Sequence, residues 1–439
     1  MKLFRLLTLS AALGAAYPLA QAQSLVELYE SARSYDASYQ SAKAQYDANQ
    51  FRAEQARAGL LPSASLTAGA SRSLFDNSNP QVERAYGTQN AALAASQPLY
   101  RPANRITFDQ SRRQLDLAEG QLAAAEQDLI TRVSQAYFDV LAAQDSLAFV
   151  RALKTSVNEQ LAFAKRNFEV GTSTITDTRE AQARYDLATA QELAAENDLL
   201  VKRLALDTLV GRTGTQPSAL AQPVRLPELQ PQDVSRWVDQ AEPSSPLIRQ
   251  ARANLDVAQL EVDKARAGHK PTVDLNASYG ITRNQGGSTT LGATGRVNLA
   301  TVGVTLNMPL FSGYAIQNRV KETLSLEEKA RADLEATRRT VAQQTRAAYF
   351  GVLSGQGQVK ALEAAEASSQ SALDANRLGY QVGVRINIDV LNAQSQLFQT
   401  KRDLAQARYN LLIGSLKLRQ ANGTLTPQDL TRINAVLAR

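Results

Sequence analysis

Few residues in this chain belong to the types that carry most enzyme chemistry. The 439 residues include no cysteine and one histidine, His269. Without cysteine the chain cannot form disulfides, thiolate nucleophiles, thiolate zinc sites or a lipidated N-terminal cysteine. A Ser-His-Asp triad or a multi-histidine metal site would need that single imidazole, which we expect on the surface at a helix-to-strand junction beside Pro271. The composition therefore argues against an enzyme, and no cofactor is expected.

Nucleotide and nucleic-acid chemistry are also poorly supported. The pair Gly286-Gly287 is not followed by the Lys-Ser/Thr of a phosphate-binding loop. The formal net charge of +6 is small, and basic residues are interspersed with acidic ones rather than clustered. We therefore expect neither nucleotide nor nucleic acid as a ligand.

The first 22 residues have the pattern of a secretory signal peptide. Lys2 and Arg5 form a positive start, an apolar stretch runs from Leu6 to Ala16, and Ala20-Gln21-Ala22 resembles a cleavage site. The alternative, an N-terminal membrane helix, is disfavoured because the apolar stretch is too short to span a bilayer. The mature chain is expected to begin at Gln23. No later run of ~18 apolar residues indicates a transmembrane helix.

The rest of the chain contains an internal repeat, with many identical residues at an offset of 212. The coincidences include Tyr137-Phe138 with Tyr349-Phe350, Val170-Gly171 with Val382-Gly383, Asp177 with Asp389, and Gly211 with Gly423. A repeat on this scale predicts two similar structural units in one chain. We place them at residues 23–233 and 234–439, joined through a Pro- and Gly-containing segment, 211–232.

Both units show the same order of elements. Each has a helical stretch (25–58; 234–268), two alternating segments (62–100; 271–310), a long helix (106–169; 316–378), a tight Val-Gly turn and a returning helix (178–210; 390–421). Residues 106–169 would span roughly 95 Å as a helix, far more than a globular helix. Leucines at positions 397, 404, 411 and 418 recur every seven residues, which is typical of a coiled coil. The helices are thus expected to form an elongated bundle.

The alternating segments predict strands with one apolar and one polar face. Val273, Leu275 and Tyr279 alternate with small polar residues, and Val302 and Val304 do the same in the next segment. Such a pattern fits barrel strands in a membrane, but it also fits ordinary half-buried hairpins. Four strands cannot close a barrel, because single-chain barrels begin at about eight. A membrane-spanning interpretation therefore requires several chains, with polar hairpin loops at 74–87 and 283–298.

The sequence resembles the TolC family of outer-membrane exit ducts over the whole mature chain. The resemblance is carried by segments including AYFDVLAAQDSL (Ala136–Leu147), NFEVGTSTITDTREAQARYD (Asn167–Asp186) and GHKPTVDLNASYG (Gly268–Gly280). It implies a mixed α/β membrane protein: a homotrimer with a twelve-stranded barrel in outer-membrane lipid and a periplasmic tunnel of coiled-coil helices.

The same resemblance implies a function in a Gram-negative bacterium. The duct would serve type I protein secretion or multidrug efflux, opened by a periplasmic adaptor (membrane fusion) protein and an inner-membrane ABC or RND pump. An alternative function of a different class is that of a soluble periplasmic coiled-coil scaffold or adaptor, which would not need the four amphipathic strand segments.

The resemblance also implies a closed entrance at the two Val-Gly turns, held by links between helices. The matching positions are Gln160, Thr176, Asp177, Tyr380 and Arg385. Arg385 is expected to clamp the Asp177 carboxylate, with Tyr380 as a second donor. Where the family has an acidic partner for Gln160, this chain has Arg377, so that link must be rewired or missing.

Other structural roles are open for these residues. Asp177-x-x-Glu180 has the form of an acidic capping box, which is compatible with a gate role. Tyr380 and its repeat counterpart Phe168 would equally serve to pack the hairpin tips.

The family further narrows its entrance with two aspartate rings. This chain has Asp389 at the first position and Asn392 at the second. A ring of Asp389 carboxylates would still attract cations, and the loss of half the charge should weaken any bound cation plug. Asp389 could instead cap the helix that follows Ile386.

Overall fold

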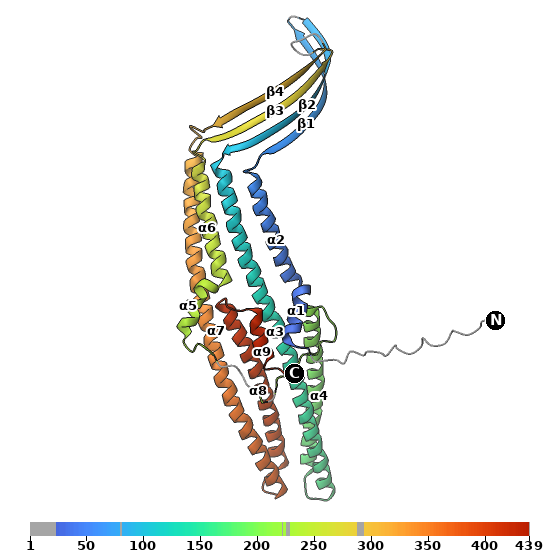
Figure 1. The fold of residues 1–439 in the computed structure, drawn as a ribbon. Helices are drawn as coiled ribbons and strands as arrows, with labels where there is room; N and C mark the ends of the chain where they lie inside the picture. The colour runs from blue at the N-terminus through green and yellow to red at the C-terminus, as the bar shows by residue number, and fades with distance from the viewer. Residues whose placement is uncertain (1–22, 80, 222, 225–228, 288–293, 439) are drawn as a thin grey trace, which may run out of the picture.

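The computed structural model describes residues 23–79, 81–221, 223–224, 229–287 and 294–438. The expected signal peptide, residues 1–22, lies outside these ranges. The described chain is elongated, with long helices making up one end and a single curved sheet the other (Figure 1).

Two very long helices run through the helical part, α3 (Pro102–Glu169) and α7 (Ala315–Gln381). Each turns back through a tight loop into a returning helix, α4 (Ile175–Val210) or α8 (Asn387–Ala421). Gly171 and Gly383 take φ of 79° and 81° in these loops, a left-handed conformation that glycine adopts without steric cost. The 68 residues of α3 span roughly 100 Å. The long helices and both Val-Gly turns are thus confirmed.

Each half also begins with a helical stretch, and both stretches are broken in two. The structure has α1 (Leu25–Tyr35) and α2 (Ala37–Ala58) in the first half, and α5 (Val234–Ser244) and α6 (Pro246–Ala267) in the second. The expectation of one continuous helix over 25–58 and another over 234–268 is therefore wrong.

Each break has a local cause. Asp36 leaves the helical conformation, accepts a 2.8 Å hydrogen bond from the Tyr39 backbone N–H as the cap of α2, and is held by the Arg132 guanidinium. Ser245 precedes Pro246, whose ring disfavours helical backbone in the residue before it. The side-chain partner of Asp36 comes from a distant helix, so the sequence around it gives no sign of the break.

One antiparallel sheet, with strand order β1-β2-β3-β4, lies at one end of the helices. Its strands are β1 (Ser63–Ser78), β2 (Gln81–Tyr100), β3 (Thr272–Gln285) and β4 (Gly295–Asn307). Pairing in the first hairpin continues to Ser78↔Gln81, so most of the segments expected as loops, 74–87 and 283–298, are strands where they are described. Their polar side chains do not prevent pairing, because neither face of the sheet contacts a core.

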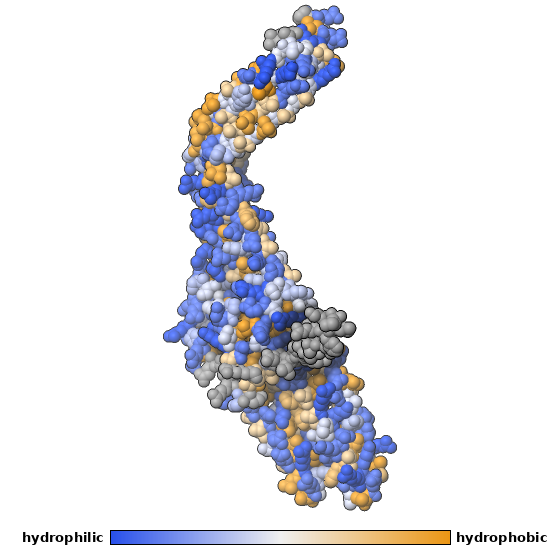
Figure 2. All heavy atoms as spheres, turned by 45° about the vertical axis from the view of Figure 1, so that its right-hand side comes forward, coloured by the Kyte–Doolittle hydropathy of each residue, from blue (hydrophilic) through white to orange (hydrophobic). Residues whose placement is uncertain are grey.

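The register places the alternating apolar residues on one face of the sheet. Leu66 lies opposite Leu93, Leu93 opposite Tyr279, and Tyr279 opposite Ala300. The other face is mostly small and polar, with Val297 and Leu299 of β4 and, toward the tip of the first hairpin, Phe75, Val82 and Tyr86 as exceptions. Figure 2 shows apolar surface over the half of the sheet nearer the helices. Within one chain this face has no cover, and Leu66, Leu93 and Tyr279 are all exposed.

The main apolar core lies around the middle of α3. Leu129, Tyr137, Phe138 and Leu141 pack there against α1, α8 and α9 (Pro427–Asn434). The Tyr137 hydroxyl donates a 2.9 Å hydrogen bond to the Ser218 carbonyl in the segment between the two halves. This core fixes the connection between the halves against the helices.

The repeat is visible in local geometry as well as in element order. The rings of Tyr137 and Phe138 meet edge to face at 5.5 Å, and those of Tyr349 and Phe350 do the same at 5.5 Å. The Tyr349 hydroxyl likewise donates to a connecting-segment carbonyl, that of Gln232. The expected unit boundary between residues 233 and 234 coincides with Asp233, the cap of α5, and stays a prediction.

Candidate gate at the helical tips

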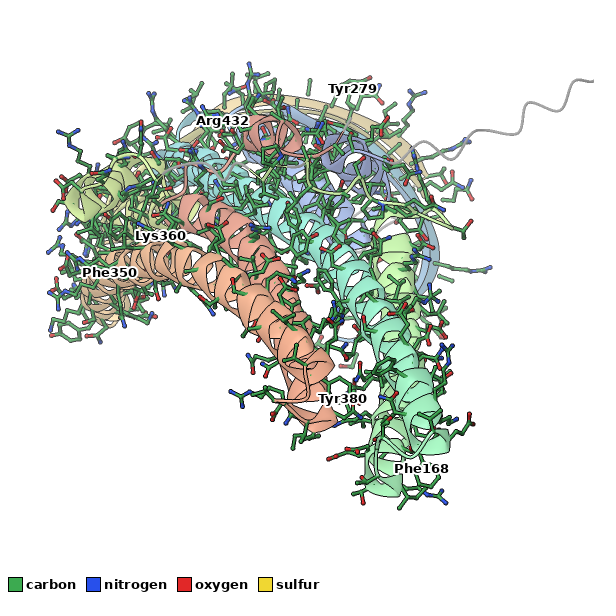
Figure 3. The ribbon with its side chains drawn as sticks, turned by 90° about the horizontal axis from the view of Figure 1, so that it is seen from below. Phe168, Tyr279, Phe350, Lys360, Tyr380 and Arg432 are labelled. Carbon is green, nitrogen blue, oxygen red and sulfur yellow. The ribbon has the colours of Figure 1, made fainter. Side chains whose placement is uncertain are left out.

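The predicted gate residues gather around the two helical turns farthest from the sheet. Viewed from that end, Phe168 marks the α3–α4 turn and Tyr380 the α7–α8 turn (Figure 3). The two hairpins approach each other here through α3 and α4 on one side and the start of α8 on the other. The site is therefore a junction between hairpins.

The Asp177 carboxylate is engaged within its own turn. It accepts hydrogen bonds from the Ser173 hydroxyl at 2.7 Å, the Thr174 backbone N–H at 3.1 Å and the Thr174 hydroxyl at 2.9 Å. Thr174 is the cap of α4 and Asp177 the third helical residue of a capping box. Burial acts to raise the pKa of Asp177, but the hydrogen bonds from Ser173 and Thr174 outweigh it and hold the pKa below its usual value.

One expectation about Asp177 is therefore corrected, and the other stays a prediction. The capping box pairs it with Thr174 rather than with Glu180, because α4 begins at Ile175, three residues earlier than the sequence suggested. Within a single chain, the described contacts of Asp177 include neither Arg385 nor Tyr380. Arg385, in the turn before α8, instead lies 3.6 Å from the Asp389 carboxylate, four residues along the chain.

Tyr380 packs rather than donating to a carboxylate. Its ring meets that of Phe163 on α3 edge to face, with centroids 5.8 Å apart, and it contacts the small cluster of Leu373, Val390 and Leu397. Thr176 is exposed at the second residue of α4. The aromatic contact makes Tyr380 part of the packing between α3 and α7.

The link from Gln160 goes to Asn387, a residue that the sequence analysis missed. Gln160 Nε2 donates a 2.5 Å hydrogen bond to Asn387 Oδ1, and Asn387 Nδ2 donates to the Asp177 carbonyl at 3.3 Å. Asn387 is only 1% exposed, so a lost partner would be costly. Arg377, at the position expected to pair with Gln160, is exposed instead. The repeat contained a signal: the counterpart of Asn387 at offset 212 is the apolar Ile175.

The constriction residues Asp389 and Asn392 lie one turn apart on α8, and each has a basic neighbour. Arg385 approaches Asp389, while Arg184 Nη2 of α4 donates a 2.8 Å hydrogen bond to Asn392 Oδ1. Asp389 makes no capping hydrogen bond, because the cap position holds Ile386, which has no acceptor. The capping alternative for Asp389 is thereby wrong, and the described ion pair of its carboxylate is the one with Arg385.

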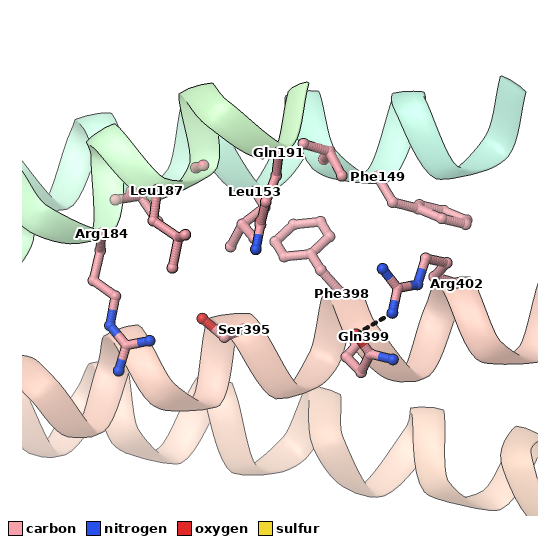
Figure 4. A pocket seen from close by; sticks show the side chains of 12 residues that line it. Phe149, Leu153, Arg184, Leu187, Gln191, Ser395, Phe398, Gln399 and Arg402 are labelled. Atoms are coloured by element: carbon pink, nitrogen blue, oxygen red, sulfur yellow. Dashed lines mark hydrogen bonds between the residues drawn. The ribbon is translucent and has the colours of Figure 1, made fainter. Parts of the chain in front are cut away.

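A groove of about 160 Å³ continues from the tip between α3, α4 and α8 (Figure 4). Phe149, Leu153, Leu187 and Phe398 give it apolar walls, and Arg184 and Arg402 border it. Arg402 donates to Gln399 Oε1 on its own helix. Near the tip of the described chain, the hydrogen bonds between hairpins are thus those of Asn387 with Gln160 and Asp177, and of Arg184 with Asn392.

Comparison with known proteins assigns the family. The family model described as "Outer membrane efflux protein" matches residues 28–212 and 237–424. The chain belongs to this family. It is 34% identical over 437 residues to the outer membrane protein TolC of Vibrio cholerae, covering 100% of this chain and 99% of that protein. It is 28% identical to the proteases secretion protein PrtF of Dickeya chrysanthemi, covering 95% and 91%.

A solved structure supports the same fold. The Campylobacter jejuni CmeC outer membrane channel superposes with a TM-score of 0.79 at 18% identity, covering 94% of this chain and 90% of that one. The fold is accordingly that of an outer membrane efflux protein, with long helices, a four-stranded sheet and two repeats.

Membership in the outer membrane efflux protein family settles the class of function. The chain is an outer-membrane exit duct, and its helical part lies on the periplasmic side. The family is one of channels rather than enzymes. In the described part of the chain, no cluster of three His, Cys, Asp or Glu side chains could hold a metal ion.

None of the described helices is long and apolar enough to cross a membrane.

Proposed function

We propose that three copies of the chain form one passive duct for type I protein secretion or drug efflux. A periplasmic adaptor and an inner-membrane ABC or RND pump would engage its helical end. The relative named for protease secretion supports the first use, and the family description, which names efflux, supports the second. The observation that best supports assembly of several copies is a difference in solvent exposure between equivalent residues of the two repeats.

On the long helices, the difference lies in the face next to the Tyr-Phe pair. Phe138 and Leu141 of α3 are 0% and 1% exposed because α8 covers them. Their counterparts at offset 212, Phe350 and Leu353 of α7, are 55% and 49% exposed. The same apolar face is thus covered in one repeat and bare in the other.

The returning helices show the complementary difference. Leu412 and Leu416 of α8 are 0% and 1% exposed where they pack on α3, whereas their counterparts Leu200 and Leu204 of α4 are 56% and 55% exposed. Each chain therefore carries two exposed apolar faces, one on α7 and one on α4, that correspond to the paired faces of α3 and α8 but leave each other uncovered. A second copy would place its α4 on α7 of the first, repeating the α3–α8 contact.

The sheet has the same unmet requirement. β1 and β4 are its edges, and unpaired backbone groups at an edge are not tolerated in lipid. Pairing β4 of one copy with β1 of the next would remove both edges as soon as the ring closes. Barrels need at least about eight strands, and the resemblance to the TolC family selects three copies and twelve strands.

The gate proposal follows from the tip geometry. The Asn387 hydrogen bonds to Gln160 and Asp177 hold the α7–α8 hairpin against α3–α4, and we assign them to the closed state. Arg385 is exposed, and in a ring of copies it can reach a neighbouring turn that carries Thr176 and Asp177. Contact with the adaptor and pump would shift the helices between two arrangements of these links.

Cysteine cross-linking tests the assembly without background, because the chain has no native cysteine. The Phe138 ring lies 5.7 Å from the Tyr409 ring, and the counterpart of Tyr409 is Asn197. The double variant Phe350→Cys with Asn197→Cys, joined by a short bis-maleimide in detergent, should give covalent trimers and nothing larger. The single variants are controls and should stay monomeric on a denaturing gel.

Single-channel recording in a planar bilayer provides the functional readout. The purified particle should conduct. A particle that fails to conduct, or a folded monomer that stays in solution without detergent, would refute the proposed duct and favour a periplasmic scaffold.

A further inference from the structure

Arginines occupy a regular position on the apolar face of the sheet. On three strands, the first charged residue beyond the apolar stretch on this face is an arginine: Arg72 on β1, Arg283 on β3 and Arg296 on β4. The equivalent residue of β2 is Gln89, which lies opposite Arg283. All three arginines are exposed. The pattern gives the apolar face a basic border on the side away from the helices.

Two of these arginines face each other directly. Arg283 and Arg296 are cross-strand partners on β3 and β4. Like charges directly opposite each other on one face destabilise a pair of strands. No carboxylate of the described residues forms an ion pair with either arginine, and Arg296 makes only a 3.1 Å hydrogen bond from Nε to Asn298 Oδ1. The repulsion is therefore not relieved within the described chain.

The surroundings of the pair combine an apolar wall with polar groups. An open hollow of about 620 Å³ is lined by both arginines, by Gln89 and by Ile281, the last apolar residue of β3 on this face. A ligand here would contact guanidinium groups at one end and the apolar band at the other. This arrangement matches an amphiphile with an anionic head better than it matches a free ion.

We propose that Arg283 and Arg296, with Arg72 nearby along the border, bind the phosphate groups of an outer-leaflet glycolipid. The arginines lie beyond the apolar band on the side opposite the periplasmic helices, so they face the outer leaflet, which in Gram-negative bacteria consists of a bisphosphorylated glycolipid. Arginine suits this ligand because its guanidinium donates two parallel hydrogen bonds to a phosphate. The proposal rests on the outer-membrane location of the sheet and not on the number of copies.

The decisive experiment compares lipid binding by the intact, detergent-extracted particle and two double variants. R283Q/R296Q removes both charges. T282Q/V297Q is the matched control, because Thr282 and Val297 are cross-strand partners next to the arginines but on the opposite face. Native mass spectrometry with hexaacylated bisphosphoryl lipid A should show at least about a tenfold loss of bound glycolipid in R283Q/R296Q and no loss in the control.

Two further probes test the chemistry of the contact. Dephosphorylated lipid A should bind wild type and R283Q/R296Q equally weakly, and R283K/R296K should restore only part of the binding, because lysine keeps the charge without the fork geometry. Inorganic phosphate at equal phosphorus concentration should not displace the glycolipid. Displacement by phosphate, or equal lipid A binding by R283Q/R296Q and the control, would overturn the proposal.

The outcome is separable from that of the duct. R283Q/R296Q should conduct in a planar bilayer and should form the same covalent trimers through positions 350 and 197. A particle that conducts normally and binds lipid A undiminished would refute the glycolipid site while leaving the duct intact.

Discussion

Asn387 shows at the residue scale how one buried amide can join two hairpins. Its side chain uses both an acceptor and a donor, one toward α3 and one toward α4. The repeat marks position 387 as polar where its counterpart Ile175 is apolar, but it could not identify the contact, because Gln160 lies 227 residues away in sequence. The resemblance placed Arg377 where the family has an acidic partner, so the Gln160 link was expected to be rewired or missing; Arg377 is exposed, and Gln160 bonds Asn387 instead. The carry-over thus named Gln160 without a partner, the structure supplies Asn387, and the gate role of both residues stays a prediction.

The Asn387 contact gives a test of the gate. Asn387→Ala removes both hydrogen bonds and leaves Gln160 and the Asp177 carbonyl without their partner, at a cost of about 1–3 kcal/mol to the closed arrangement. Planar-bilayer recordings should show a higher open probability or conductance than wild type. Arg377→Ala is the matched control, since its side chain is exposed, and it should behave as wild type. If Asn387→Ala left the conductance unchanged, this junction would not hold the entrance shut.

Asp36 gives a second residue-scale test, this time of stability. The hydrogen bonds from the Arg132 guanidinium hold the pKa of Asp36 below its usual value, against the opposing effect of burial. Because folding lowers this pKa, the carboxylate stabilises fully above the unfolded value of about 3.9, and the contribution is lost as pH falls through the lower folded value. Asn can still cap a helix, so Asp36→Asn removes mainly the charge.

The expected loss for Asp36→Asn is about 2 kcal/mol at neutral pH. It should appear as a lower Tm in circular dichroism at pH 7, and the difference from wild type should shrink as the pH falls below about 4. Asp116→Asn, at an exposed ion pair on α3, serves as control and should change Tm little at any pH. A Tm difference independent of pH would contradict this account of Asp36.

At the scale of elements, sequence periodicity predicted the long helices and the strands, but it missed a helix break and the strand lengths that contacts between distant residues determine. The long helices, the Val-Gly turns and the alternating strands follow from local patterns, so their existence was predictable. The break at Asp36 depends on a side chain from α3, whereas the break at Ser245 follows from the adjacent Pro246, a local signal that periodicity does not register. Strand length depends on cross-strand pairing, which the polar composition of residues 74–87 concealed.

The repeat exposes one element-scale requirement that can be tested. Gly211 caps α4 and its counterpart Gly423 follows the Asn422 cap of α8, with φ of 70° and 78°. Each lies against a helix break: Gly211 against Tyr35 and Gly423 against Ser245. A Cβ at Gly423 would come within 2.4 Å of the Ser245 Cα, where backbone must move. The left-handed conformation adds strain for any other residue.

Gly423→Ala should therefore lower stability by more than about 2 kcal/mol, measured as a lower Tm and a reduced yield of extracted oligomer. Gly414→Ala is its control within α8, because the new methyl would meet only Val352 Cγ2 at an ordinary 3.5 Å. That variant should be neutral or slightly stabilising, since alanine favours a helix over glycine. Equal behaviour of the two variants would mean that the contact with Ser245 does not matter.

At the scale of the whole molecule, the described chain has surfaces without a partner at both its helical end and its sheet end. Its helices leave apolar faces bare on α4 and α7, and its sheet leaves two edges and an apolar face uncovered. The sequence predicted the need for other chains from strand number alone. It could not identify which helix faces would meet, because the equivalent phenylalanines and leucines of the two repeats are apolar alike and only burial distinguishes them.

The orientation of the sheet in the bilayer can be tested with two adjacent residues. Val302 lies on the apolar face, opposite Ala277, and Thr301 lies next to it on the other face, opposite Ser278. If the apolar face contacts lipid, Val302→Arg places a charge in hydrocarbon at a cost of about 2–4 kcal/mol per copy. In a closed ring of three copies this cost applies three times. Thr301→Arg would face the water-filled interior, where the same side chain stays hydrated. We therefore expect Val302→Arg to reduce the outer-membrane fraction of the protein severely, while Thr301→Arg assembles and alters only ion selectivity in bilayer recordings. The reverse result would place the apolar face inside the barrel, and equal results would mean that the sheet does not distinguish lipid from water.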